Sequence, residues 1–265
     1  MNKRHYQHFP LVFLRTDHAD CPAIKPKSLL SFKLRYYLPE WLTRFFDDMK
    51  SSPQSSESHL HRRITSLCLL AAAVMPIIFF GTQIVAAPFY PGYSFAQQSV
   101  SMLGTHFSRH PWIFNAGGTL TGLAALAGAV GLYQIFRTKT HFLLSMLIGF
   151  SVACIGIMTI KGGMFPMPDP RHNAWGVLQN FVIVTPFFLL MGVLKQAHRP
   201  GLRLYLLLSV TLLFLLVPLE SRLGRGTLQR LITVGSLLPV GVVGFVFWRE
   251  LQIGALDPRD SENAS

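Results

Sequence analysis

The residues of this chain with the right types for chemistry lie in three polar stretches between long apolar segments. They are Ser101 and His110 in the first stretch, Asp169 and His172 in the second, and Glu220, Arg222 and Arg230 in the third. A serine beside a histidine suits nucleophilic catalysis, with a carboxylate to orient the imidazole. Histidine nitrogens and carboxylate oxygens are also ligands that Zn²⁺ accepts.

Two activities are compatible with these side chains. In the first, Ser101 is a nucleophile activated by His172, and Asp169 or Glu220 orients the histidine. In the second, His110, Asp169 and His172 bind Zn²⁺, because an Asp-x-x-His spacing places both side chains on one face of a helix. The chain lacks a specific His-Glu-x-x-His or Gly-x-Ser-x-Gly motif at these positions. We therefore expect no cofactor apart from this candidate zinc site, and whether the protein is an enzyme stays open.

Several of these residues also have a purely structural interpretation. Asp169 followed by Pro170 is typical of a helix N-cap with proline at the first helical position. Glu220 would pair with Arg222 or Arg225 at the membrane edge. Ser101 would hydrogen-bond to the loop backbone, and His110 would be an ordinary residue of the membrane interface.

The elements that position these residues are membrane helices. Half of the chain is hydrophobic and only 14% is charged, against about a quarter in soluble proteins. Windows of about 20 residues, the length that crosses hydrocarbon, predict helices at 64–87, 112–136, 142–160, 174–194, 203–219 and 231–248. The short basic connections between them favour antiparallel neighbours. We therefore predict an all-α integral membrane protein with six transmembrane helices in an antiparallel bundle.

The distribution of lysine and arginine predicts the orientation of this bundle. With a cytoplasmic N-terminus, 18 of the 24 cations lie inside and 6 outside, so we predict cytoplasmic termini in a plasma (inner) membrane. The net charge of +12 then does not indicate nucleic acid as a partner. The predicted regions are a basic leader (1–63) with a short amphipathic helix and a Ser-rich linker, the transmembrane domain (64–248) and a polar tail (249–265).

Small residues follow one face of the second predicted helix. Gly118, Gly122, Ala125 and Ala129 share this face, and small residues at such a spacing allow helix backbones to approach closely in lipid. We interpret the face as helix packing within one chain. A weak homodimer or a ligand groove is the alternative.

The polar stretches also carry a family resemblance. The residues that carry it are Tyr93-Ser94, Ser99-x-Ser101-x-x-Gly104, Pro111, Phe114-Asn115, Gly163-x-Phe165-Pro166-x-x-Asp169-x-x-His172, Glu220 and Gly226-x-Leu228-Gln229-Arg230. Residues of about 66–248 resemble the prokaryotic membrane family called domain of unknown function 998, and are more distantly similar to the Frag/DRAM/Sfk group. Met102 departs from the pattern, since a polar or acidic residue is expected there. The resemblance implies a six-helix bundle with its shared motifs on one extracytoplasmic face, and it implies no activity.

The leading hypothesis is a multi-pass membrane protein that binds a lipid headgroup or small polar ligand outside the cytoplasm. Its ligand-binding residues would be Ser101, Asp169, His172, Glu220, Arg222 and Arg230. Arginine suits an anionic group on such a ligand. The alternative is a membrane-embedded hydrolase or transferase acting on lipid, either metal-dependent or using Ser101. A small-molecule transporter comes third, because the predicted spans offer mainly serine and threonine as polar groups. All of these require the three stretches to meet in space.

Overall fold

The computed structural model describes residues 40–173, 176–196, 199–216, 219 and 222–254, with side chains from His59 onward. The chain divides into two units, 1–56 and 57–265. The boundary between them falls within α2 (Glu40–Ala86). The predicted amphipathic helix and Ser-rich linker both lie within α2. Most of the predicted leader (1–39) and the end of the predicted tail (255–265) lie outside the described residues.

Every regular element in the described part of the second unit is a helix. After α2 they are η1 (Ala87–Phe89), η2 (Val100–Gly104), α3 (Pro111–Lys139), α4 (Phe142–Met164), η3 (Pro170–Asn173), α5 (Leu178–Leu194), α6 (Pro200–Leu216) and α7 (Arg225–Gly254). A helix therefore occurs at each of the six segments that the sequence predicts. The expected all-helical fold is confirmed for the described residues.

The lengths of these helices divide them into two classes. Within the described residues, four helices are long and apolar enough to cross a membrane: His59–Phe89, Pro111–Lys139, Phe142–Met164 and Arg225–Ile253. The other two, α5 and α6, are apolar but have 17 residues each, which is the lower limit for a membrane span. These apolar helices indicate an integral membrane protein.

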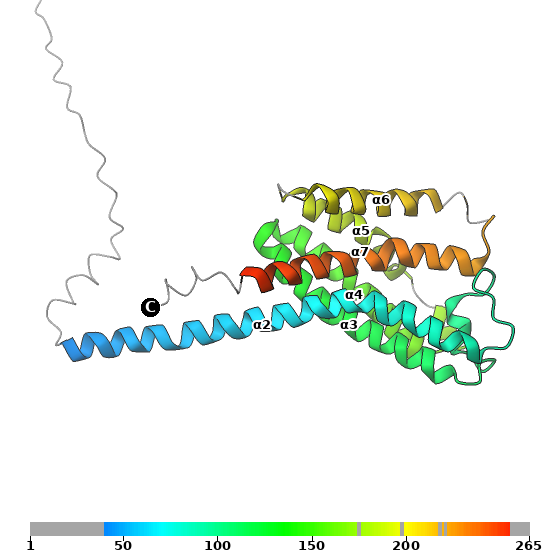
Figure 1. The fold of residues 1–265 in the computed structure, drawn as a ribbon, viewed down its shortest axis with the longest axis horizontal. Coiled ribbons are helices and arrows are strands. Elements are labelled where there is room, and N and C mark those ends of the chain that lie inside the picture. Colours follow the sequence, from blue (N-terminus) through cyan, green and yellow to red (C-terminus); the bar gives the residue numbers. More distant parts are fainter. Residues whose placement is uncertain (1–39, 174–175, 197–198, 217–218, 220–221, 255–265) are drawn as a thin grey trace, which may run out of the picture. The chain divides into compact units, whose positions relative to one another are not determined.

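Neighbours along the chain are also neighbours in the bundle. α3 packs on α4, α4 on α5 and α5 on α6, while α7 contacts α5, α6 and α3. Figure 1 shows these helices running alongside one another, with α5 next to α6. The part of α2 in this unit packs on α3 and α7, where Ala72 contacts Gly128 and Gly244.

Glycines allow α3 to pack closely on α4. A Cβ at Gly122 would lie 2.5 Å from the Gly156 carbonyl oxygen of α4, and a Cβ at Gly156 would lie 2.8 Å from the Gly122 oxygen. Gly118 lies one turn earlier, opposite Gly163. The small-residue face predicted from the sequence is therefore used inside the chain, which confirms that interpretation.

The two ends of this helical unit differ in their connections. At one end, called the loop end, lie the segment 87–110, the turn 165–173 and the beginning of α7. A 3.0 Å backbone hydrogen bond from Thr227 N to Ala96 O joins the segment 87–110 to α7. At the other end, the connections α3–α4 and α5–α6 are short, and the end of α7 lies beside them. Most of the candidate catalytic and ligand-binding residues lie at the loop end.

Candidate functional site

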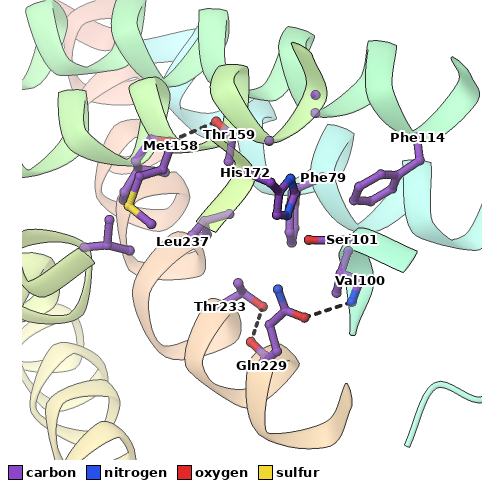
Figure 2. Close-up of a pocket in the computed structure, with 15 residues that line it drawn as sticks. Phe79, Val100, Ser101, Phe114, Met158, Thr159, His172, Gln229, Thr233 and Leu237 are labelled. Atoms are coloured by element: carbon purple, nitrogen blue, oxygen red, sulfur yellow. Dashed lines mark hydrogen bonds between the residues drawn. The ribbon is translucent and has the colours of Figure 1, made fainter. Parts of the chain in front are cut away.

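A cavity of about 150 Å³ lies among the helices near the loop end. Its walls are mainly apolar and come from Phe79, Val100, Phe114, Gly118, Ile155, Met158, Gly162, Gly163, Val182 and Leu237. Its polar lining residues are Ser101, Thr159, His172, Gln229 and Thr233. Figure 2 shows these polar side chains around one space, although they come from η2, α4, η3 and α7. An apolar space with a few converging polar groups is the usual form of a small-molecule site.

Among the described residues that line this cavity, His172 is the one titratable side chain. It is 4% exposed, and its Nδ1 lies 2.8 Å from the Phe165 carbonyl oxygen. A carbonyl oxygen only accepts, so Nδ1 carries the proton and donates it. In the neutral ring, Nε2 is then the nitrogen with the lone pair. The turn before α5 therefore fixes both the position and the tautomer of this histidine.

Gln229 joins α7 to η2 at the rim of the cavity. Its Oε1 accepts a 2.8 Å hydrogen bond from the Val100 backbone nitrogen, which orients the amide so that its NH₂ group faces inward (Figure 2). Ser101 follows Val100, and its hydroxyl points toward the same space. Because Gln229 donates nothing in the Val100 bond, its NH₂ group is available to a molecule in the cavity.

The threonines of the lining are satisfied by their own helices. The Thr159 hydroxyl donates to Ile155 O at 2.9 Å, and the Thr233 hydroxyl donates to Arg230 O at 2.9 Å. A hydroxyl that donates to its helix keeps acceptor capacity. These residues therefore add acceptors to the cavity wall, while Ser101 and Gln229 add donors.

Asp169 has a different position from His172. Its Oδ1 accepts a 2.8 Å hydrogen bond from the Arg171 backbone nitrogen, and its Oδ2 accepts one of 2.6 Å from Arg171 Nη2. Pro170 is the first residue of η3, so the N-cap interpretation from the sequence is confirmed. The Arg171 side chain and backbone, which donate to the carboxylate, lower the pKa of Asp169 to about 2.

This arrangement corrects the spacing argument for a zinc site. The Asp-x-x-His pair was expected to share a helical face, but Asp169 precedes the short helix that contains His172. Asp169 pairs with Arg171 and does not line the cavity, whereas His172 does. Among the described residues, no group of three His, Cys, Asp or Glu side chains is close enough to bind one metal ion. Zinc binding stays a prediction that the observed positions do not strengthen.

Arg230 lies at the loop end with its guanidinium against the segment 93–98. Its Nη1 donates to Phe95 O at 2.5 Å and Gln98 O at 3.2 Å, and its Nη2 donates to the Tyr93 hydroxyl at 2.5 Å. The guanidinium also lies over the Phe95 ring, 4.8 Å from its centroid. Burial raises the pKa of the Tyr93 hydroxyl, and Arg230 partly opposes this effect. Arg230 therefore fixes the segment that leads to Ser101.

The remaining predicted site residues lie elsewhere. His110 precedes α3 at its N-cap position, is exposed and stacks edge-on against Phe89, with centroids 4.8 Å apart. Arg222 is exposed and does not line the cavity. Glu220 lies outside the described residues. The structure thus brings Ser101 and His172 together at one cavity, and it separates Asp169, His110, Arg222 and Arg230 from it.

The motifs of the loop end form one connected set of contacts. Arg230 binds Tyr93, Gln229 binds Val100, and Asn115 Nδ2 donates to Gly104 O at 3.1 Å. A family described as "Protein of unknown function (DUF998)" matches residues 70–246 of the chain. The chain belongs to this family. No curated protein and no solved structure matches the chain. The more distant likeness to the Frag/DRAM/Sfk group stays a prediction.

In this DUF998 protein, only some of the residues that carry the family resemblance line the cavity. Several motif residues stabilise the loop end: Gly226 leaves no room for a Cβ beside the Gln98 and Phe95 carbonyl oxygens. Ser101, His172 and Gln229 are the motif residues that line the cavity. The sequence-based site did not include Gln229 and Thr233. A signal was available, because Gln229 and Thr233 are four residues apart on α7, and residues at that spacing lie on the same side of a helix.

Proposed function

We propose that this DUF998 protein is a membrane protein that binds a ligand in its cavity. The ligand is the polar group of a lipid or a small polar molecule with a short apolar body. The cavity carries this proposal, because Ser101, His172 and Gln229 converge there from three separate elements. Polar side chains inside a membrane bundle are costly unless they are satisfied or used. A bound molecule with a hydrogen-bonding head would use the Ser101 hydroxyl and the Gln229 NH₂ group.

The size and lining of the cavity define the class of ligand. A space of about 150 Å³ is on the order of the volume that binds a benzene-sized molecule in a protein core. The inward donors are the Ser101 hydroxyl and the Gln229 amide, and the acceptors include the threonine hydroxyls. The ligand group that fits both is a neutral alcohol, amide or carbonyl, attached to an apolar chain or ring that lies against the aromatic and aliphatic walls.

The test is to identify what occupies the cavity. The full chain is taken from native membranes into nanodiscs, and separately reconstituted with a single synthetic phosphatidylcholine. Mass spectrometry then identifies the molecules released on denaturation. We expect about one copy of a small amphiphile per chain. Its retention in the synthetic bilayer indicates a free ligand, and its replacement by the added phospholipid indicates a lipid group as the occupant.

Two variants separate occupancy from hydrogen bonding. Ser101→Leu fills the cavity and should abolish the bound species, while Ser101→Ala removes one donor and should reduce its amount. Ser209→Ala is the matched control, because the Ser209 hydroxyl donates to Tyr205 O within α6 and does not line the cavity. Equal amounts of the bound species in Ser101→Leu and in the wild type would contradict the proposal.

A second candidate function is a lipid hydrolase or transferase. The observation in its favour is the tautomer of His172, since Nδ1 donates to Phe165 O and Nε2 is then the basic nitrogen in a cavity that Ser101 also lines. A fluorophosphonate that reacts with activated serines tests it. Labelling of the wild type that is lost in both Ser101→Ala and His172→Gln supports catalysis, and a wild type that is never labelled argues against a serine nucleophile.

We also infer that α5 and α6 cross the membrane, which gives six spans with both termini in the cytoplasm of the inner membrane. Both helices pack on α7, which is itself long enough to span. Single cysteines at Ser94 and Thr138, in a background without native cysteine, test the orientation. An impermeant maleimide added to intact cells should label Ser94→Cys and not Thr138→Cys; the reverse pattern would contradict the orientation.

A further inference from the structure

The end of the helical unit opposite the loop end is strongly cationic. Its lysines and arginines are Arg62, Arg63, Arg137, Lys139, Lys195, Arg199, Arg203 and Arg249, which we call the basic end. Two of these cations donate to backbone carbonyl oxygens of another helix: Arg62 donates to Leu251 O at 2.9 Å, and Arg203 donates to Leu194 O at 3.3 Å. Among the side chains that the structure describes, Glu250 is the one carboxylate of this end.

Two of these cations converge on that carboxylate. Arg199 Nη2 lies 2.7 Å from Glu250 Oε2, and Lys139 Nζ lies 4.0 Å from Glu250 Oε1. Both cations also lie over the ring of Phe247, at 5.0 Å for Arg199 and 5.7 Å for Lys139. Phe247 is 1% exposed, so its buried ring lies beneath both cations. The side chains of Lys139 and Arg199 remain 35% and 22% exposed.

We propose that Lys139 and Arg199 bind the phosphodiester of an anionic glycerophospholipid. Two positive charges face one negative charge, so the cluster has a net positive charge that a second anion would balance. A guanidinium presents paired donors that match phosphate oxygens, and an ammonium adds a point charge. Basic pockets between helices at a membrane face bind anionic headgroups.

The surroundings of the pair favour a lipid over a soluble anion. Lys139 ends α3, and Arg199 immediately precedes α6, whose outer face exposes Leu204, Leu207 and Leu208. A diacyl lipid at this position places its phosphate against the cations and its chains along these leucines. Arg137, whose guanidinium lies over the Phe142 ring at 5.0 Å, adds a further positive charge at the same end.

The test measures lipid binding to the full chain by native mass spectrometry. The probes are phosphatidylglycerol and phosphatidylcholine with identical acyl chains, added to detergent-solubilised protein. We expect phosphatidylglycerol to bind more tightly than phosphatidylcholine, and Lys139→Gln/Arg199→Gln to weaken its binding roughly thirtyfold. Arg109→Gln, an exposed cation at the loop end, is the matched control and should leave the affinity unchanged. Equal affinities of the wild type and the folded double variant would overturn the proposal.

Glu250→Gln distinguishes a lipid site from a purely structural ion pair. This test remains valid even if the double variant does not fold. Removal of the competing carboxylate should tighten phosphatidylglycerol binding, by roughly fivefold for about 1 kcal/mol of repulsion. Unchanged or weaker binding would overturn the proposal. Inorganic phosphate is the second probe. Millimolar phosphate should not displace phosphatidylglycerol, and full displacement would assign the site to a free anion instead of a lipid.

Discussion

The two ends of the bundle use arginine in opposite ways. At the loop end, Arg230 donates to the Phe95, Gln98 and Gly226 carbonyl oxygens and to the Tyr93 hydroxyl. At the basic end, Arg199 pairs with the carboxylate of Glu250, which is 44% exposed. Backbone carbonyls are fixed by the fold, whereas an exposed carboxylate pair is screened by salt and open to other anions. Arg230 therefore stabilises the fold, whereas Arg199 can also bind another anion.

The difference also explains where the cavity lies. Arg230 and Gln229 are adjacent on α7, and they bind the two ends of the segment that reaches Ser101. That segment therefore has a defined position relative to α7. The cavity therefore lies beside a segment that side-chain hydrogen bonds hold to α7.

The largest effect is expected for Arg230→Met. The variant removes donors from two carbonyl oxygens and a phenol of the segment 93–98, so we expect the free energy of unfolding to fall by about 3 kcal/mol. Arg225→Met is the control, because Arg225 is an exposed cation at the beginning of α7. Denaturant unfolding in detergent measures both. Equal losses in the two variants would show that Arg230 has no special role.

Two glycines extend the comparison to the backbone. A Cβ at Gly226, in the loop end, would overlap carbonyl oxygens of Gln98 and Phe95, whereas a Cβ at Gly201, near the basic end, meets nothing within 4 Å. Gly226→Ala should cost about 2 kcal/mol because the backbone must shift. Gly201→Ala should be neutral or stabilising by up to about 1 kcal/mol, since alanine favours the helix. Melting temperatures of the two variants give the comparison, and a destabilised Gly201→Ala would contradict it.

A smaller effect is expected when Arg199 is replaced. Arg199→Gln breaks a partly exposed ion pair, so the loss in unfolding free energy should be below about 1 kcal/mol. It should also shrink in 1 M salt, which screens such pairs. The loss in Arg230→Met should not depend on salt, because its partners are neutral. A salt-independent loss at Arg199 would remove the distinction between the two ends.

The sequence was sufficient for the helices because their signal is local. Hydrophobic runs predicted a helix at each of six segments, and the glycine spacing at Gly118 and Gly122 predicted close packing. The ends of the runs were less certain, since polar residues continue a helix as readily as they end it. Phe142–Met164 thus extends past Lys161, and α7 begins before the predicted residue 231.

The site was predicted less well because it depends on contacts between distant segments. Ser101 and His172 were identified by residue type, and the cavity does bring them together. The role of Arg230 was not foreseen, since nothing in the sequence shows that backbone carbonyls of residues 95 and 98 lie beside it. Asp169 was assigned to the site by a helical spacing that the cap geometry replaces. Residue type indicates chemistry, but the partner of each group is a property of the fold.

The smallest effect is expected for Asp169. This residue lies in the loop end, but it pairs with an arginine, as Glu250 does at the basic end. Arg171 lowers the pKa of Asp169 from 3.8 to about 2. A carboxyl group with a lowered pKa in the folded state stabilises the fold above its unfolded pKa, and this contribution disappears as the pH falls through the folded value. The melting-temperature difference between wild type and Asp169→Asn should therefore change mainly between about pH 4 and pH 2. A difference that stays the same between pH 4 and pH 2 would contradict the lowered pKa of Asp169.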